Sequence, residues 1–264
     1  MSKKFLLIVE GSKTEKNIFT EIFKKYNFSV KDCGKLQIEG DKNNLLSQFY
    51  LSDTNKNSDV YIVEGPRNRI HDWLSLFDKQ QCDFERLFSE LNSCFAGIFI
   101  IYDVDHTSKD ELSKMFERYQ DETTGLLLLS SPCIEVLGDI GRNEPLKVEH
   151  LSKYKTEQNL IHEAKDKKHT RDYIIDNFES LVCYYLDKNV QESGDKNIMN
   201  HPDFVLGKIN ELNERKFISR DYMPVDYRYF TTVVYVCIAY IMGLTKEFDN
   251  YTIVKKYFES FINK

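Results

Sequence analysis

Residues 5–17 read FLLIVEGSKTEKN. Five apolar residues, Phe5–Val9, are followed by Glu10-Gly11 and then by a segment whose apolar residues, at 18–23, recur at helical spacing. A continuous apolar run is typical of a strand that is covered on both faces of a parallel sheet. The stretch therefore predicts a strand, a turn and a helix, which is the opening of a β-α unit.

The same alternation of patterns continues to about residue 140. Further strands are expected at Val60–Val63, Gly97–Tyr102 and Leu126–Leu129, and helical patterns lie at Ile70–Phe77, Phe84–Phe95 and Lys109–Tyr119. This order predicts an α/β fold with a mostly parallel sheet flanked by helices over residues 1–140.

The pattern changes after about Gly141. A polar, lysine-rich segment, Lys147–Lys168, precedes four helical patterns, at Thr170–Lys188, Pro202–Arg215, Tyr229–Gly243 and Tyr251–Asn263. Because no β-α alternation is visible there, residues 141–264 are expected to form a C-terminal helical region.

Composition excludes several classes of protein. The chain has 264 residues, 41% of them hydrophobic and 30% charged, which is the balance of a globular protein rather than a disordered one. A net charge of −6 argues against a general basic surface for nucleic acid but leaves room for a local basic groove. The longest apolar stretch, Thr231–Leu244, is shorter than the about 20 residues that cross a bilayer, so no membrane span is expected. The six cysteines form no CxxC pair, and we expect them to be buried, reduced thiols of a cytoplasmic protein.

Acidic residues follow three of the predicted strands. Glu10 follows the first, Asp103 and Asp105 the third and Glu135 the fourth, while Glu15 lies about one helical turn beyond Glu10. Functional groups of an open parallel sheet gather at the carboxyl ends of its strands, where converging carboxylates repel one another. A hard divalent cation such as Mg²⁺ or Mn²⁺ relieves that repulsion. The pattern predicts a metal site of the kind that catalyses phosphoryl-ester chemistry.

Simpler interpretations exist for the same residues. Acids are common near the start of any helix, which accounts for Glu10 and Glu15, and Asp-x-Asp often makes a turn or a cap. Glu64-Gly65 echoes Glu10-Gly11, but an ordinary turn explains it. The basic cluster at 165–171 suits either a nucleic-acid backbone or a solvated face.

Taken together, these residues resemble the TOPRIM domain, the α/β metal-binding module of topoisomerases, primases and OLD-family nucleases. Its signature is a glutamate after the first strand and an Asp-x-Asp after a later one, here Glu10 and Asp103/Asp105. The resemblance is closest to RloB-like stand-alone TOPRIM proteins, whose opening motif is similar to residues 5–17 and whose Asn-Pro-Cys-Phe-Glu motif is similar to residues 131–135. The latter motif departs by Ser131 in place of Asn, and the tryptophan that usually follows it is lacking. OLD nucleases and the AriB effector of the PARIS system are the other near neighbours, and the resemblance covers about residues 4–139.

The resemblance implies a role for each acid. Asp103 and Asp105 would hold Mg²⁺, and Glu10 would bind metal or relay a proton. Glu15 and Glu135 would help to place a second metal ion.

The resemblance also implies a function: a Mg²⁺-dependent endonuclease that cleaves DNA or RNA, with tRNA as one candidate, as a toxic effector of prokaryotic anti-phage defence. The sequence contains no Gly-x-x-x-x-Gly-Lys-Ser/Thr, so an ATPase would have to be a separate subunit. The alternative is a TOPRIM-like binding subunit of an ATPase-containing defence complex, inactive alone. A third interpretation treats the acids as caps and turns only, and a homo-oligomer is compatible with all three.

Overall fold

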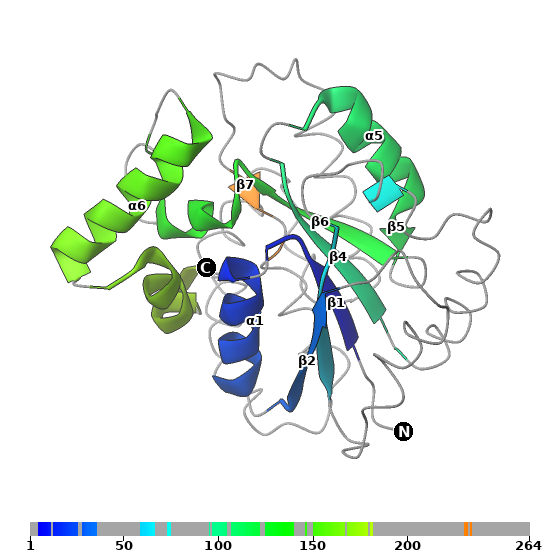
Figure 1. Ribbon diagram of the computed structural model, residues 1–264, viewed down its shortest axis with the longest axis horizontal. Helices are drawn as coiled ribbons and strands as arrows, with labels where there is room; N and C mark the ends of the chain where they lie inside the picture. The colour runs from blue at the N-terminus through cyan, green and yellow to red at the C-terminus, as the bar shows by residue number, and fades with distance from the viewer. Residues whose placement is uncertain are drawn as a thin grey trace, which may run out of the picture. The chain divides into compact units, whose positions relative to one another are not determined.

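The computed structural model describes part of the chain (Figure 1). The described residues are 5–11, 13–25, 28–35, 59–66, 73–74, 95, 97–104, 107–121, 125–139, 146, 150–166, 168–178, 180–181, 230–231 and 233.

A seven-stranded sheet organises these residues, in the order β2-β3-β1-β4-β6-β5, with β7 paired to β6. The five longer strands, which run parallel, are β1 (Phe5–Val9), β2 (Val30–Lys35), β3 (Val60–Glu64), β4 (Gly97–Asp103) and β6 (Gly125–Ser131). Two-residue strands β5 (Gln120–Asp121) and β7 (Phe230–Thr231) pair antiparallel with β6. The predicted α/β class with a mostly parallel sheet is confirmed.

Strand β1 lies at the centre of the sheet. β1 is hydrogen-bonded to β3 and β4, with Val9 opposite Glu64 on one side and Ile101 on the other. Every residue of these three strands is buried. This burial explains why their sequences are continuous apolar runs rather than alternating ones.

The described helices begin where the sequence offers helix-start signals. α1 (Thr14–Lys25) has an acid in its first turn and buries its apolar face while packing against β2 and β3. α5 (Lys109–Arg118) begins with a capping box, in which Ser108 and Glu111 each accept a hydrogen bond from the other's backbone N–H. A 3₁₀ helix, η1 (Ile134–Asp139), follows β6, and α6 (Leu151–Asp166) precedes a helical segment at 170–178.

Three elements differ from the sequence-based expectation. β2 was not expected, because VKDCGK is polar and the strand lies at the sheet edge with none of its six residues fully buried. α6 lies in the lysine-rich segment, where its buried face contains Tyr154, Gln158 and His162 instead of an aliphatic stripe. The predicted helix Tyr229–Gly243 is wrong at its start, since residues 230–231 pair with β6 as β7. Most of the helices expected at 70–95, and those expected at 202–215 and 251–263, lie outside the described residues.

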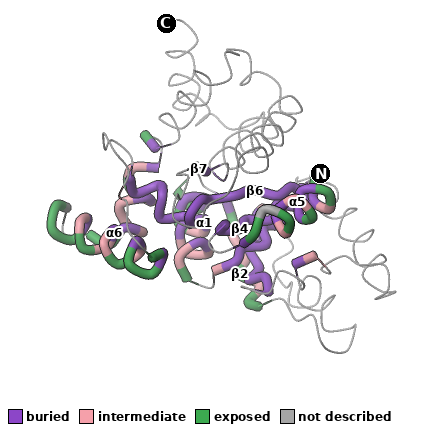
Figure 2. The backbone as a smooth tube through the Cα atoms, turned by 90° about the horizontal axis from the view of Figure 1, so that it is seen from above, coloured by how far each residue is buried: buried purple, intermediate pink, exposed green. Residues whose placement is uncertain are grey.

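The chain divides into two compact units. The first combines Met1–Tyr102 with Thr107–Leu128, and the second combines Asp103–His106 with Leu129–Lys264. The carboxyl ends of β4 and β6 therefore belong to the second unit. The division expected near residue 140 stays a prediction. Figure 2 shows the buried strands and, on α6, buried, intermediate and exposed residues mixed along the helix. Among the described helices, none is long and apolar enough to cross a membrane.

Candidate metal site

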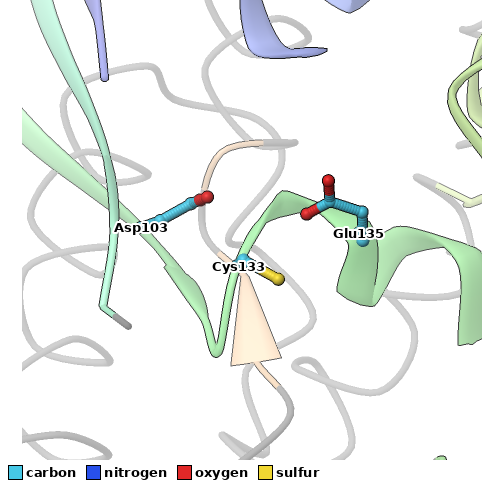
Figure 3. A group of neighbouring side chains, drawn as sticks. All are labelled: Asp103, Cys133 and Glu135. Atoms are coloured by element: carbon cyan, nitrogen blue, oxygen red, sulfur yellow. The ribbon is translucent and has the colours of Figure 1, made fainter. Parts of the chain in front are cut away.

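Three buried side chains of the second unit come together: Asp103, Cys133 and Glu135. One ligand atom from each residue, two carboxylate oxygens and a sulfur, lies within 4.8 Å of the other two (Figure 3). Asp103 is 3% exposed and Cys133 is fully buried, while Glu135 is 9% exposed. The group is therefore removed from bulk water, unlike a typical cluster of surface acids.

The ends of two strands position these side chains. Asp103 is the last residue of β4. The backbone N–H of the following residue, Val104, donates to the Ser130 carbonyl at 2.8 Å. Ser130 lies near the end of β6, where its hydroxyl is 3.0 Å from that of Thr231 on β7. The chain then turns through a cis Ser131–Pro132 peptide to Cys133.

η1 carries Glu135 and is held by one face of α6. Tyr154, Gln158 and His162 lie on that face at successive intervals of four residues. The Tyr154 hydroxyl donates to Asp139 Oδ2, and Gln158 Nε2 donates to the Tyr154 hydroxyl at 3.0 Å.

The same face also contacts the end of η1 closely. His162 Nε2 donates to the Gly138 carbonyl at 3.0 Å, because a carbonyl oxygen can only accept. A Cβ on Gly138 would lie 2.8 Å from Thr170 and 2.9 Å from His162, so only glycine fits. These contacts fix the short helix that presents Glu135.

The electrostatics of the cluster disfavour further negative charge. Burial, followed by the carboxylates of Glu135 and Asp103, raises the pKa of the Cys133 thiol well above its ordinary value of 9.0. The thiol is therefore protonated at neutral pH. Lys155 opposes this charge from α6, with its Nζ 3.9 Å from Asp103 Oδ2 and its side chain 38% exposed.

One acceptor of the cluster is unused in the part of the chain that the structure describes. Glu135 Oε2 is buried without a hydrogen-bond partner among those residues. A buried carboxylate oxygen that lacks a donor is costly unless a cation or a proton compensates it. A divalent ion fits this donor set, because it would satisfy Glu135 and reduce the repulsion between Glu135 and Asp103.

The structure places the predicted site residues in different ways. It brings Asp103 and Glu135 together in the second unit. Glu10 and Glu15 lie in the first unit, where both are buried. Asp105 lies outside the described residues.

The two first-unit acids flank a tight turn. The Glu10 N–H donates to the Ile101 carbonyl at 3.1 Å, which continues the pairing of β1 with β4. The Glu15 carboxylate packs over the backbone of Gly11, since a Cβ on Gly11 would lie 1.7 Å from Glu15 Oε2. Gly11 is thus the residue that lets this glutamate fold back over its own turn.

Cys133 was not predicted from the sequence as a member of the cluster. A single cysteine far from any other suggests a core thiol, and Cys133 does pack in an apolar cluster with Leu151 and Tyr154. The available signal was its position two residues before Glu135, inside the motif at 131–135.

The chain was compared with protein-family models, with curated proteins and with solved structures. No family model, no curated protein and no solved structure matches the chain.

Proposed function

We propose that this protein is a divalent-metal-dependent endonuclease of the TOPRIM type, acting as a toxic effector in prokaryotic anti-phage defence. The observation that carries the proposal is the meeting of Asp103 and Glu135, which leave the carboxyl ends of β4 and β6 and bring buried carboxylate oxygens within 4.8 Å of each other. Carboxylates that converge in this way can hold the metal ion that assists phosphodiester hydrolysis.

Asp103 and Glu135 would hold Mg²⁺ or Mn²⁺. The metal roles that the resemblance implies for Glu10, Glu15 and Asp105 stay predictions. When bound, such an ion polarises the phosphate and lowers the pKa of an attached water. Burial of Asp103 keeps water away from the ligand oxygens and strengthens their interaction with a cation. Lys155 Nζ lies 3.9 Å from Asp103 Oδ2 and its side chain is 38% exposed, so its ammonium group would attract a phosphate oxygen.

The basic cluster at 165–171 contributes less to the proposal. Lys168 pairs with Asp176, and Arg171 Nη2 is 3.0 Å from Asp172 Oδ1. These partners neutralise part of the positive charge and favour a solvated face. Nucleic-acid contact is therefore proposed at Lys155 rather than along this segment, and the substrate is proposed as DNA or RNA, including tRNA.

A cleavage assay tests the proposal. The full chain is incubated with plasmid DNA, single-stranded DNA and tRNA, with chelator, Mg²⁺ or Mn²⁺. We expect cleavage only with metal, and its loss in Asp103→Asn and in Glu135→Gln. Glu163→Gln, which removes an exposed acid from α6, is the matched control and should cleave normally. Cleavage by Asp103→Asn at the rate of the unaltered protein would remove the proposal.

The separate ATPase subunit belongs to the proposal as the trigger that would release the nuclease. Co-purification from the native host tests it. An ATPase that co-purifies with the chain, together with no cleavage by the isolated chain under any metal, would favour the binding-subunit alternative.

A further inference from the structure

The sulfur atom of Cys133 distinguishes this cluster from one made of carboxylates alone. In Figure 3 the Asp103 and Glu135 carboxylates point toward each other, and the Cys133 side chain lies beside them. Its Sγ is within 4.8 Å of an oxygen of each. The inference below rests on the site of the proposed function and concerns which ion that site prefers.

Cys133 packs with Leu151 and Tyr154, and its sulfur also lies within 4.8 Å of two buried carboxylate oxygens. Thiols are weak hydrogen-bond donors and weak acceptors, so Cys133 satisfies these oxygens poorly. Lys155 neutralises part of the negative charge of the carboxylates. Its side chain is 38% exposed, and its ammonium group pairs with Asp103 rather than with Glu135. Glu135 is 9% exposed, and its Oε2 is buried without a hydrogen-bond partner among the described residues. The sulfur of Cys133 and this unsatisfied carboxylate therefore belong to one buried group of candidate ligands.

Donor chemistry then selects among cations. Mg²⁺ takes oxygen ligands in near-octahedral geometry and gains little from sulfur. Zn²⁺ and Co²⁺ accept cysteine sulfur and carboxylate oxygen together, and three protein ligands with an open fourth position are typical of catalytic zinc sites.

We propose that Asp103, Cys133 and Glu135 form a mixed oxygen–sulfur site that binds a thiophilic divalent ion of the Zn²⁺ and Co²⁺ class more tightly than Mg²⁺. On binding, the S–H bond of Cys133 breaks, a metal–sulfur bond forms, and the proton leaves to solvent. No electrons are transferred, because the sulfur keeps its oxidation state.

Cobalt spectroscopy on the full chain tests the inference without an activity assay. The chelator-treated protein is titrated with Co²⁺, and absorption is recorded in the near-ultraviolet, where thiolate-to-cobalt charge transfer occurs, and in the visible. Zn²⁺ and Mg²⁺ are then added as competitors. We expect a charge-transfer band that saturates at one ion per chain, that Zn²⁺ abolishes and that Mg²⁺ leaves nearly unchanged.

Two cysteine variants assign the band. Cys133→Ser should abolish it and weaken Co²⁺ binding by at least about 10-fold, since loss of even an outer-shell partner costs about 10- to 100-fold. Cys33→Ser, on the edge strand β2, is the matched control and should keep both the band and the affinity. Circular dichroism checks that each variant is folded, and the spectrum of the unaltered protein is decisive even where Cys133→Ser is not.

The outcomes separate this inference from the proposed function. Co²⁺ bound without a charge-transfer band, or a band that persists in Cys133→Ser, overturns the mixed site and leaves a carboxylate metal site intact. Normal cleavage by Asp103→Asn and Glu135→Gln would instead remove the nuclease, whereas a band dependent on Cys133 would keep the metal site.

Discussion

Two strand ends of this protein use buried glutamates in opposite ways. After β1, Glu15 folds back over Gly11, a neighbour four residues away in its own turn. After β6, Glu135 meets Asp103, which comes from β4. The first glutamate is accommodated by local geometry, while the second is placed beside a like charge that only a distant strand supplies. An acid at a strand end is therefore weak support for a metal site until a second segment brings another ligand to it.

Activity gives the largest expected difference between the two strand ends. We expect Glu135→Gln to lower metal-dependent cleavage by at least about 100-fold, because losing a ligand should exceed the about 10- to 100-fold cost of losing an outer-shell contact. Glu15→Gln should lower it by about 10-fold or less. Initial cleavage rates at saturating Mn²⁺ check this ordering, and a larger loss in Glu15→Gln would reverse the comparison.

Glycine substitutions sharpen the comparison through stability. Gly138→Ala would press a methyl group against His162 of α6 and against Thr170, which starts the helical segment at 170–178, and should lower the free energy of unfolding by about 1–3 kcal/mol. In Gly11→Ala the obstacle is the carboxylate end of the flexible Glu15 side chain, which can swing away. We expect that variant to cost less than Gly138→Ala. Urea denaturation followed by circular dichroism measures both, and equal costs would contradict the account.

Much of the architecture could be predicted because its cause is local. Continuous apolar runs identified β1, β3, β4 and β6, since both faces of these strands are covered. β2 was not predicted, because an edge strand needs no apolar pattern in its sequence.

The candidate site was predicted only in part, for a related reason. The strand-end rule found Asp103 and Glu135, but a cysteine that faces two carboxylates looks the same in sequence as one that faces leucines. α6 was not predicted, because the side chains of Tyr154, Gln158 and His162 on its buried face make polar contacts instead of forming an aliphatic stripe. In both cases, Cys133 and α6, the role depends on residues that are distant in the chain, so the local sequence does not reveal it.

The pH dependence of stability isolates the thiol beside the carboxylates. Since the folded protein raises the pKa of Cys133, the unfolded chain loses this proton first as pH rises. The thiol's contribution is complete below the ordinary pKa of 9.0 and is lost progressively above it, by up to about 1.4 kcal/mol per pH unit.

Cys133→Ser removes this contribution, so the metal-free variant should lose less stability than the unaltered protein between neutral pH and pH values above 9.0. Thermal or urea unfolding with chelator present, at several pH values, measures the difference. If the stability of both proteins fell equally with pH, the Cys133 thiol would not be buried beside the two carboxylates.

The smallest expected effect concerns Lys155. Lys155→Met removes a cation 3.9 Å from Asp103 and should tighten Mn²⁺ binding by a few-fold, because the remaining charge at the cluster is more negative. Partial exposure screens the pair, so the free energy of unfolding should change by less than about 1 kcal/mol. Lys153→Met, at an exposed position of the same helix, is the control and should leave Mn²⁺ affinity unaltered in titration calorimetry. An equal change in both variants would mean that Lys155 acts only through overall charge.

Anomalous scattering from crystals grown with Mn²⁺ tests most directly whether Asp103 and Glu135 share an ion. The account predicts a peak bonded to a carboxylate oxygen of each residue. Crystals that diffract well at saturating Mn²⁺ but show no peak there, or show the two carboxylates turned apart, would contradict it.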